Sequence, residues 1–394
     1  MSDRPPTRTQ GTDGHPRARR PLADRGVLGW RWVRVVVGLV VLLGAAALIA
    51  DHVELGYYVL LPGTAQPVTP LVRVPGARSH PVHGQLLLTD VYVTQVSALG
   101  YLADRLDGDA QLVPIVTLLG PDVAPSELVP QGYLEMAQSQ AGAKAAALAS
   151  LGYRVTERSA GALVYAVVPG SPASKVLAVG RIVTAVDGTA TPDACAFAQT
   201  LAARRPGQRV TLSIEQSHVT SRAVIVSGPV VRRTTVLARW PKAVARSASS
   251  AACPLPATAG ARGFLGVEVQ TQQRWHYPFR VSVRTTAIGG PSAGLAMALG
   301  IVDELSTGRL TGGRTVAVTG TIDRTGAVGE VGGVAQKTVA AERAGATVFI
   351  VPAGQRATAM SRATPRLHVY GVTSLAEALG VLRRLGGAVP AVHR

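Results

Sequence analysis

The apolar and polar positions divide the chain into a polar amino-terminal stretch, one long apolar run and a series of shorter alternating segments. Residues 1–30 lack the apolar spacing that could repay the entropy of folding, so we predict a disordered tail. The uncharged run from Val35 to Ala50 reaches membrane-spanning length with its flanking tryptophans, which predicts one transmembrane helix over residues 31–52. The small residues at 45–47 leave a cleaved signal peptide as the alternative.

Downstream of the apolar run, residues 57–152 change from strand to helix periodicity. Residues 84–94 are rich in β-branched and apolar side chains, as in a strand, and follow an extended entry with several prolines. From Leu134 to Leu151, alanines and leucines recur at helical spacing and end at Gly152, a frequent helix stop. This segment is therefore predicted to open a folded domain.

The sequence pattern of residues 153–216 is typical of a separate small domain, which we call the small module. Strands are predicted at 163–168, 182–186 and 209–215. Thr191 can cap a helix over 194–203 that has Pro192 at its first position. Residues 217–262 then form a connecting segment, which becomes rich in Ser, Ala and Pro from 245 to 261, as linkers are.

The last region, residues 263–388, alternates strands and helices, which predicts an α+β domain. Its predicted strands cover 265–270, 280–284, 315–318 and 347–351, and its predicted helices cover 292–305 and 336–344. A glycine-rich hairpin is expected from 319 to 329.

The charge distribution predicts how the chain is oriented across the membrane. The formal charge is +17, yet only 4% of the residues are aromatic and the arginines are scattered, so the composition does not indicate nucleic-acid binding. The densest arginines precede the apolar run, whereas Asp51 and Glu54 follow it. The positive-inside rule then predicts a single-pass cell-membrane protein with a cytoplasmic amino terminus and an extracytoplasmic remainder.

Cys195 and Cys253 would both lie in that oxidising compartment, where two thiols in one chain often pair. Two buried, unpaired thiols are the alternative, because the sequence does not supply their separation. No two histidines have the spacing of metal ligands, and no phosphate-binding Gly-x-x-x-x-Gly-Lys-Ser/Thr loop occurs. We therefore expect neither a metal nor another cofactor.

Ser292 and Lys337, 45 positions apart, are the candidate catalytic pair. Only four of the 40 basic Lys and Arg residues are lysines, and a desolvated lysine amine can act as a base, which arginine cannot. Gly289, Gly290 and Pro291 place Ser292 at a predicted helix start, where backbone N–H groups can stabilise an oxyanion. The simpler interpretation is a helix cap and a solvated lysine.

A second possible nucleophile system would use His276 as the base for Ser292, with Glu268 as the group that orients the imidazole. Both residues precede Ser292 in the same region. His276 lies among Trp275, Tyr277 and Pro278, a sequence more typical of a surface or interface cluster.

Two runs in the small module form one pattern: Val167–Ala173, which reads VVPGSPA, and Val179–Gly188, which reads VGRIVTAVDG. This pattern resembles a bacterial PDZ domain, with Arg181 where that family usually has Asp. The resemblance implies that a groove between the strand 162–168 and the helix 193–203 accepts an extended protein or peptide substrate by strand addition. The alternative is a packing module whose groove is filled by its own chain.

The runs 288–300, 319–329 and 332–346 resemble the proteolytic domain of Lon proteases, and most of all that of membrane-anchored, PDZ-containing Lon-like serine proteases of bacteria. Such proteins carry the PDZ domain as an insert, which would make residues 57–152 the N-terminal part of the Lon-like region. The resemblance implies a dyad of Ser292 and Lys337. It also implies a supporting hydrogen bond from Thr319, an oxyanion hole that includes Gly290, and a homo-oligomer, with a hexamer as one form.

These observations together predict an ATP-independent serine endopeptidase that cleaves unfolded or exposed segments of extracytoplasmic or membrane proteins. Cytosolic Lon relatives usually carry an acidic residue where this chain has Gly289, so a carboxylate contribution to the dyad is in question. The alternative from another class is a catalytically inactive, membrane-anchored PDZ scaffold that only captures peptides.

Overall fold

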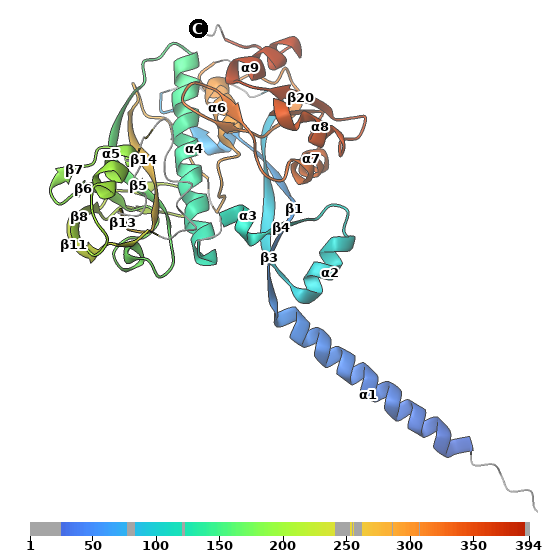
Figure 1. Ribbon diagram of the computed structural model, residues 1–394. Helices are drawn as coiled ribbons and strands as arrows, with labels where there is room; N and C mark the ends of the chain where they lie inside the picture. The colour runs from blue at the N-terminus through green and yellow to red at the C-terminus, as the bar shows by residue number, and fades with distance from the viewer. Residues whose placement is uncertain are drawn as a thin grey trace, which may run out of the picture.

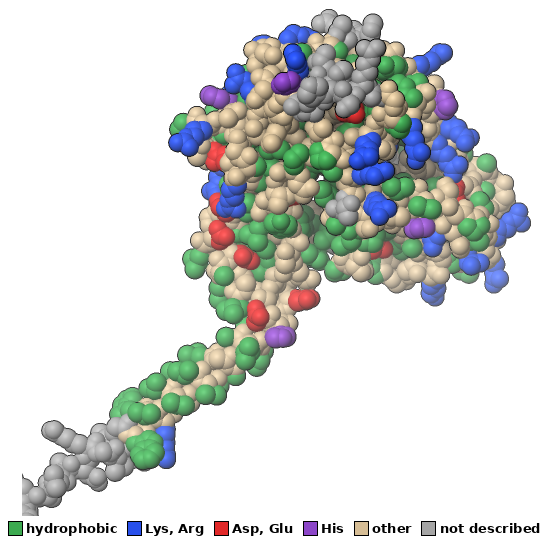
Figure 2. Space-filling view, turned by 180° about the vertical axis from the view of Figure 1, so that it is seen from behind, with side chains coloured by type: hydrophobic (Ala, Val, Ile, Leu, Met, Phe, Trp, Pro, Cys, Tyr) green, Lys and Arg blue, Asp and Glu red, His purple; other side chains and the backbone are tan. Residues whose placement is uncertain are grey.

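The computed structural model describes residues 25–76, 83–119, 123–240, 253, 255, 262–285, 287–306 and 308–390. One long helix, α1 (Arg25–His52), projects from a globular part (Figure 1), and apolar side chains cover most of the stretch of it that Figure 2 draws in colour. Because α1 begins at Arg25, the predicted tail is wrong for residues 25–30, and the rest of it lies outside the described residues. Within α1, the 21 residues Trp32–His52 are long and apolar enough to cross a membrane, a test that a signal sequence also passes.

Two regions far apart in the sequence form one six-stranded sheet with the order β20-β19-β16-β3-β1-β4. Its strands are β1 (Glu54–Pro67), β3 (Gln85–Ser97), β4 (Gln111–Pro114), β16 (Thr315–Val318), β19 (Val348–Pro352) and β20 (His368–Val372). β16 runs parallel to β3 and β19, whereas β1 is antiparallel to β3 and β4. Since β3 and β16 come from opposite sides of the small module in sequence, that module is inserted between the two halves of this sheet.

The remaining elements of this part of the chain are short strands, helices and 3-10 turns. The strands form the pairs β2 (Val72–Arg73) with β15 (Ser282–Val283) and β17 (Thr321–Ile322) with β18 (Val328–Gly329). The helices are α2 (Ala98–Leu106), α3 (Ile115–Leu119), α4 (Leu128–Ser150), α6 (Gly294–Glu304), α7 (Val334–Arg343), α8 (Arg356–Met360) and α9 (Leu375–Arg384). The 3-10 turns of this part are η1 (Thr69–Leu71), η2 (Pro125–Glu127) and η5 (Ala353–Gln355), whereas η3 (Pro172–Lys175) belongs to the inserted module.

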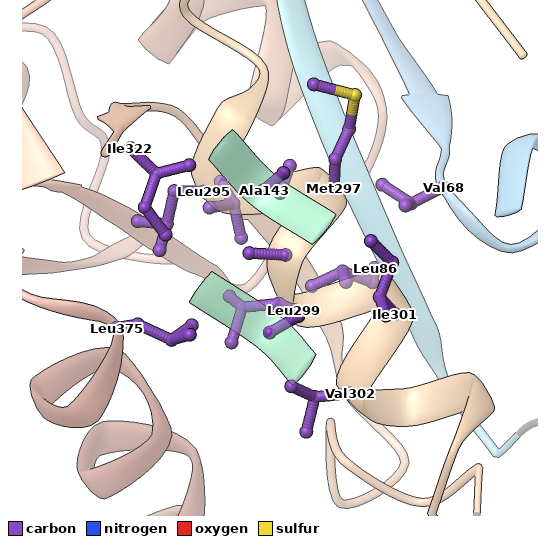
Figure 3. Close-up of a cluster of buried hydrophobic side chains, with 14 of the residues drawn as sticks. Val68, Leu86, Ala143, Leu295, Met297, Leu299, Ile301, Val302, Ile322 and Leu375 are labelled. Carbon is purple, nitrogen blue, oxygen red and sulfur yellow. The ribbon is translucent and has the colours of Figure 1, made fainter. Parts of the chain in front are cut away.

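Helix α6 is the centre of the main hydrophobic core. Its residues are buried on every side, so it has no polar face. Its leucines and Met297 pack among Val68, Leu86 from β3, Ala143 from α4 and Leu375 from α9 (Figure 3). This packing fixes the segment immediately before α6, which carries Ser292.

The inserted module is a second sheet with the order β11-β8-β6-β5-β14 and one covering helix, α5 (Ala194–Ala202). Its strands are β5 (Thr156–Val167), β6 (Ile182–Val186), β7 (Thr189–Ala190), β8 (Arg209–Glu215), β11 (Val230–Val236) and β14 (Val267–His276). Two further strand pairs flank this sheet. The pair β9 (His218–Val219) with β10 (Ile225–Val226) contacts α4, and the pair β12 (Ala238–Arg239) with β13 (Gly263–Phe264) contacts α5. β11 and β14 thus lie outside the predicted bounds of 153–216 and still belong to its sheet.

The cap of α5 differs from the prediction. Asp193 is the capping residue, and its carboxylate accepts a hydrogen bond from the Ala196 N–H at 2.7 Å. The buried Thr191 hydroxyl instead donates to the Val183 carbonyl at 3.4 Å. A carboxylate next to the first helical residue serves the free N–H groups better than a hydroxyl placed two residues further away.

Candidate active site

Ser292 lies in the turn that leads into α6, and its side chain is half-buried. The helix begins at Gly294, so Ser292 precedes it by two residues, whereas the sequence predicted a helix start at the serine. The Ser292 carbonyl accepts hydrogen bonds from the Gly320 N–H at 2.9 Å and from the Thr319 hydroxyl at 3.3 Å. These bonds fix the backbone of the serine against the segment that follows β16.

Lys337 lies in α7 and is 2% exposed, which makes it one of the largest fully buried side chains. Burial in a site without bulk water disfavours the ammonium form. It lowers the pKa of Lys337 from 10.5 to about 7. The amine can therefore lose its proton near neutral pH, as a general base must.

Thr319 joins the two candidate residues. The Lys337 Nζ donates to the Thr319 Oγ1 at 3.3 Å, and the Thr319 hydroxyl donates to the Ser292 carbonyl at 3.3 Å. Thr319 is fully buried. Among the described residues, no hydrogen bond directly links the Ser292 hydroxyl to Lys337, so Thr319 is the residue that both contact.

Asp90 is a carboxylate that acts on the candidate base Lys337 and that the sequence did not indicate. It lies in β3, and its negative charge raises the pKa of Lys337, opposing the larger effect of burial. Its oxygens accept hydrogen bonds from the Thr64 hydroxyl at 2.9 Å and the Gln66 amide at 3.4 Å. No local pattern marks this residue, because only the pairing of β1 with β3 and the packing of α7 on both bring Asp90 toward Lys337.

The backbone N–H groups of Gly290 and Ser292, the candidate oxyanion donors, differ in whether they already donate a hydrogen bond. The Gly290 N–H donates to the Gly132 carbonyl at 2.8 Å, so in this conformation it is engaged with α4. Gly290 has a φ of 82°, a backbone conformation that favours glycine. Among the described residues, no acceptor is bonded to the Ser292 N–H, which leaves it available to a developing oxyanion.

Side chains of helix α4 hold the loop that carries Ser292 in place through hydrogen bonds. The sequence analysis did not predict this role. The Ser139 hydroxyl donates to the Pro291 carbonyl at 2.8 Å, and the Gln140 amide donates to the Thr285 hydroxyl at 2.9 Å. Ser139 and Gln140 are both buried. Buried polar residues inside an alanine-rich helix are the sequence signal that could have indicated this contact, because such groups need partners.

A cavity of about 290 Å³ lies where α4, the inserted module and the loop before Ser292 meet. It is lined by Glu135, Gln138, Ser139, Tyr165, Gln270, Pro291, Thr321 and Ile322. The Tyr165 hydroxyl donates to the Glu135 carboxylate, whose pKa burial raises. The inserted module therefore contributes side chains to a cavity that adjoins the candidate nucleophile.

The predicted groove of the inserted module needs correction. β14 pairs antiparallel with the outer edge of β5 over most of its length, so the edge at 162–168 is occupied by the chain itself. The edge strand is β14, and α5 packs beside it, with the Ala194 N–H donating to Thr271 Oγ1 at 3.1 Å. Sequence reasoning missed this because β14 follows the connecting segment and was assigned to the last domain.

The open edge of β14 can be identified from the hydrogen bonds of β5. The N–H of Val167 donates to Glu127 and that of Val164 donates to the Arg181 carbonyl, so both point away from β14. In an antiparallel ladder their partners, Val267 and Val269, then direct their backbone groups to the opposite side. In the described part of the chain, the backbone groups of Val267 and Val269 therefore point away from β5, on the edge of β14 that no other described strand covers.

Cys195 in α5 and Cys253 are joined by a disulfide, with their Cα atoms 5.5 Å apart. The bond fastens the helix of the inserted module to the connecting segment. The described residues contain no group of three or more His, Cys, Asp or Glu side chains that could hold a metal ion.

The second nucleophile system is excluded. His276 and Glu268 lie on the same strand, β14, eight residues apart. At about 3.3 Å per residue, an extended strand separates them by about 26 Å. Glu268 therefore cannot orient the imidazole of His276.

Comparison with sequence families gives two matches. Residues 265–365 match the Lon protease (S16) C-terminal proteolytic domain, and residues 149–225 match the PDZ domain. The chain thus contains a Lon-type proteolytic domain and a PDZ domain in a mixed α+β fold, as predicted, together with one apolar amino-terminal helix. The Lon-type domain supports a serine protease, and the PDZ domain implies peptide or protein binding.

Individual relatives are similar to parts of the chain. A Lon protease of Methylocella silvestris is 42% identical over 92 residues, which cover 23% of this chain and 11% of that protein. Lon protease 1 of Bacillus subtilis is 38% identical over 88 residues, which cover 22% of this chain and 11% of that protein. The chain therefore spans about a tenth of the length of these relatives. A solved PDZ domain of an SdrC-like protein from Listeria monocytogenes matches 28% of this chain and 86% of its own, with 18% identity and a TM-score of 0.20.

Proposed function

We propose that this chain is a membrane-anchored serine endopeptidase that works without ATP and uses Ser292 as nucleophile and Lys337 as base. The observation that carries the proposal is the buried Lys337 amine, whose pKa lies at about 7 and whose hydrogen-bond partner, Thr319, also bonds to the Ser292 backbone. A lysine that keeps a water-like pKa would be charged at neutral pH and could not accept a proton.

In the proposed mechanism, the neutral Lys337 amine accepts the proton of the Ser292 hydroxyl while the oxygen attacks the scissile carbonyl. The oxyanion that forms accepts a hydrogen bond from the Ser292 N–H. The Lys337 ammonium then gives its proton to the leaving amine, and the peptide bond breaks to leave an acyl-serine. Lys337 next accepts a proton from water, whose oxygen attacks the ester carbonyl. The bond between the acyl group and the Ser292 oxygen then breaks, the Lys337 ammonium returns its proton to that oxygen, and the acid is released.

Thr319 would orient the amine during these transfers, because a hydroxyl that accepts from Lys337 restricts the rotation of the amine. Asp90 would limit how far burial lowers the pKa of Lys337, because a nearby negative charge favours the ammonium. The two effects together leave the amine basic enough to take the serine proton and neutral enough to be available.

The PDZ groove along β14 would present substrates. A segment in extended conformation can add to this edge through its backbone groups, and α5 forms the opposite wall.

Substrates would be unfolded or cut in exposed segments, because the chain carries no phosphate-binding loop of an ATP-driven motor. The Trp32–His52 span would anchor the protein with its catalytic part outside the cytoplasm, and the protein would act as a homo-oligomer.

The direct test is cleavage of casein by the full chain in detergent micelles. Ser292→Ala and Lys337→Ala should each abolish cleavage. Lys144→Ala is the matched control, because Lys144 is half-buried and burial also lowers its pKa, but it lies beside Tyr277. Equal cleavage by the Ser292→Ala protein would overturn the dyad.

The scaffold alternative is tested in the same preparation. An unmodified protein that binds extended peptides through the PDZ groove but cleaves none of them would be a peptide-capturing scaffold. Light scattering that shows only a monomer would contradict the homo-oligomer. Protease treatment of intact cells that leaves the globular part undigested would contradict the extracytoplasmic location.

A further inference from the structure

A second hollow, unrelated to the candidate dyad, is lined by arginines. It has a volume of about 790 Å³. Its lining residues are Arg73, Pro75, Arg222, Val224, Arg280, Ser282, Val283 and Arg284. Figure 2 shows Lys and Arg side chains spread over the globular part of the molecule.

The arrangement of three of these arginines follows from strand periodicity. Residues 280–284 read Arg-Val-Ser-Val-Arg, with Val281 and Val283 buried at 6% exposure. Because side chains alternate along a strand, both arginines and Ser282 point to the outer face. In the pairing of β15 with β2, Arg73 stands opposite Ser282. Diagonal neighbours across antiparallel strands are about 7–8 Å apart, so Arg73 lies between the two other arginines.

The fourth arginine comes from the inserted module. Arg222 lies at the tip of the hairpin formed by β9 and β10. The neighbouring Ser221 carbonyl accepts a hydrogen bond from the Ala287 N–H at 3.1 Å, which fastens this tip to the segment that leads to Ser292. Arginines from two separate parts of the chain therefore line the same hollow.

These arginines have no counter-charge in the described part of the chain. No acidic side chain lines the hollow, and the five ion pairs formed by described residues all use other arginines. Like charges on facing strands destabilise a sheet. A bound anion would remove that cost, and four exposed guanidinium groups offer bidentate partners for it.

We propose that this hollow binds an acidic, extended segment of a polypeptide substrate. Alternate side chains of an extended peptide are about 7 Å apart, which matches the spacing of arginines across β2 and β15. The apolar residues in the lining, Pro75 and Val224 among them, accept the methylene stems of glutamates. The inference rests on the proposed function and deepens it by naming a substrate class.

Binding is measured first, and independently of catalysis, with the full-length Ser292→Ala protein in detergent micelles. The probe is a fluorescein-labelled peptide of alternating Glu and Ser, followed by anisotropy. Arg280→Gln combined with Arg284→Gln should weaken its binding about tenfold. Arg309→Gln combined with Arg366→Gln is the matched control with the same loss of charge, because both arginines are exposed and neither side chain bonds to a described residue. The control should bind as the parent does.

The proposal would be overturned if both double variants lost the same affinity for the Glu-Ser peptide, or if a Lys-Ser peptide bound as tightly as the Glu-Ser peptide. It would also be overturned if pyrophosphate displaced the labelled Glu-Ser peptide at a far lower concentration than unlabelled Glu-Ser peptide does. The last result would assign the site to a phosphate-bearing ligand.

The kinetic arm uses the active full chain and two peptide substrates that differ only in an acidic or a neutral flanking tract. The 280/284 double variant should raise KM about tenfold for the acidic substrate, with kcat unchanged and the neutral substrate unaffected. An equal change for both substrates would remove the substrate role. Absence of cleavage by the parent protein would instead contradict the proposed function, while the binding result stands by itself.

Discussion

The Gln138 side-chain amide donates to the Gln270 side-chain oxygen at 3.0 Å, which joins α4 to the edge strand of the PDZ sheet. The next two residues of α4, Ser139 and Gln140, donate hydrogen bonds to Pro291 and Thr285 in the segment that leads to Ser292. A single helix therefore contacts both the edge strand β14 of the PDZ sheet and the segment that carries the candidate nucleophile.

This contact predicts an energetic coupling between the two glutamines. A double-mutant cycle of Gln138→Ala and Gln270→Ala should give an interaction of about 0.5–1.5 kcal/mol in the free energy of unfolding, as expected for one neutral hydrogen bond. Urea denaturation measures it. A cycle that pairs Gln138→Ala with Gln355→Ala serves as the control and should be additive, because Gln355 bonds to Val331 instead. Additivity in the first cycle would contradict the contact.

The pH dependence of cleavage should report the base. Because burial lowers the pKa of Lys337 to about 7 and only the neutral amine accepts a proton, kcat/KM should rise with pH through about 7 and then level off. A profile of kcat/KM from about pH 5 to about pH 11 measures this. A rise near pH 10 would mean that the amine is solvated.

Removing the charge of Asp90 should move this profile in a known direction. The carboxylate favours the ammonium, so Asp90→Asn should lower the pKa of Lys337 and shift the rising limb of the profile to lower pH. Asn retains an oxygen that can accept from Thr64 and Gln66. A limb that stays in place would show that Asp90 does not act on the amine.

Ser139→Ala should impair the nucleophile loop more than the fold. It removes the hydrogen bond to the Pro291 carbonyl, and the loss of about 0.5–1.5 kcal/mol in loop positioning predicts a drop in kcat of about threefold to tenfold. Ser150→Ala is the control, because Ser150 is in the same helix and also bonds to a carbonyl, that of Ala147, at 2.8 Å. If both variants lose the same activity, Ser139 does not position the loop.

Replacing the candidate base should stabilise the protein while abolishing cleavage. Folding displaces the pKa of Lys337 from 10.5 to about 7, so the unfolded chain binds more protons between these values and stability rises with pH across that window. Lys337→Met removes this cost, which is at most about 5 kcal/mol for such a displacement. The gain in the free energy of unfolding should be largest at pH 7 and below and should vanish toward pH 10. Urea denaturation at several pH values measures it, and a loss of stability at pH 7 would contradict a desolvated amine.

The sequence by itself determined the local elements and the chemical candidates. Periodicity predicted the apolar helix, the alternation in 153–216 and the α+β order of 263–388. The scarcity of lysine, with the glycines before Ser292, singled out Ser292 and Lys337. These inferences depend on contacts a few residues apart, which a linear pattern records.

The tertiary structure alone decided which edge of the PDZ sheet is open, where Asp90 stands and what holds the nucleophile loop. β14 covers the predicted edge of β5 from 100 or more positions away in the sequence, and Ser139 in α4 bonds to Pro291 across 152 positions. Strand pairing and helix packing join residues that are so far apart in the sequence that their contacts produce no periodic pattern in it. The burial that lowers the pKa of Lys337 has the same origin, because β1, β3 and α7 must assemble before its amine leaves water.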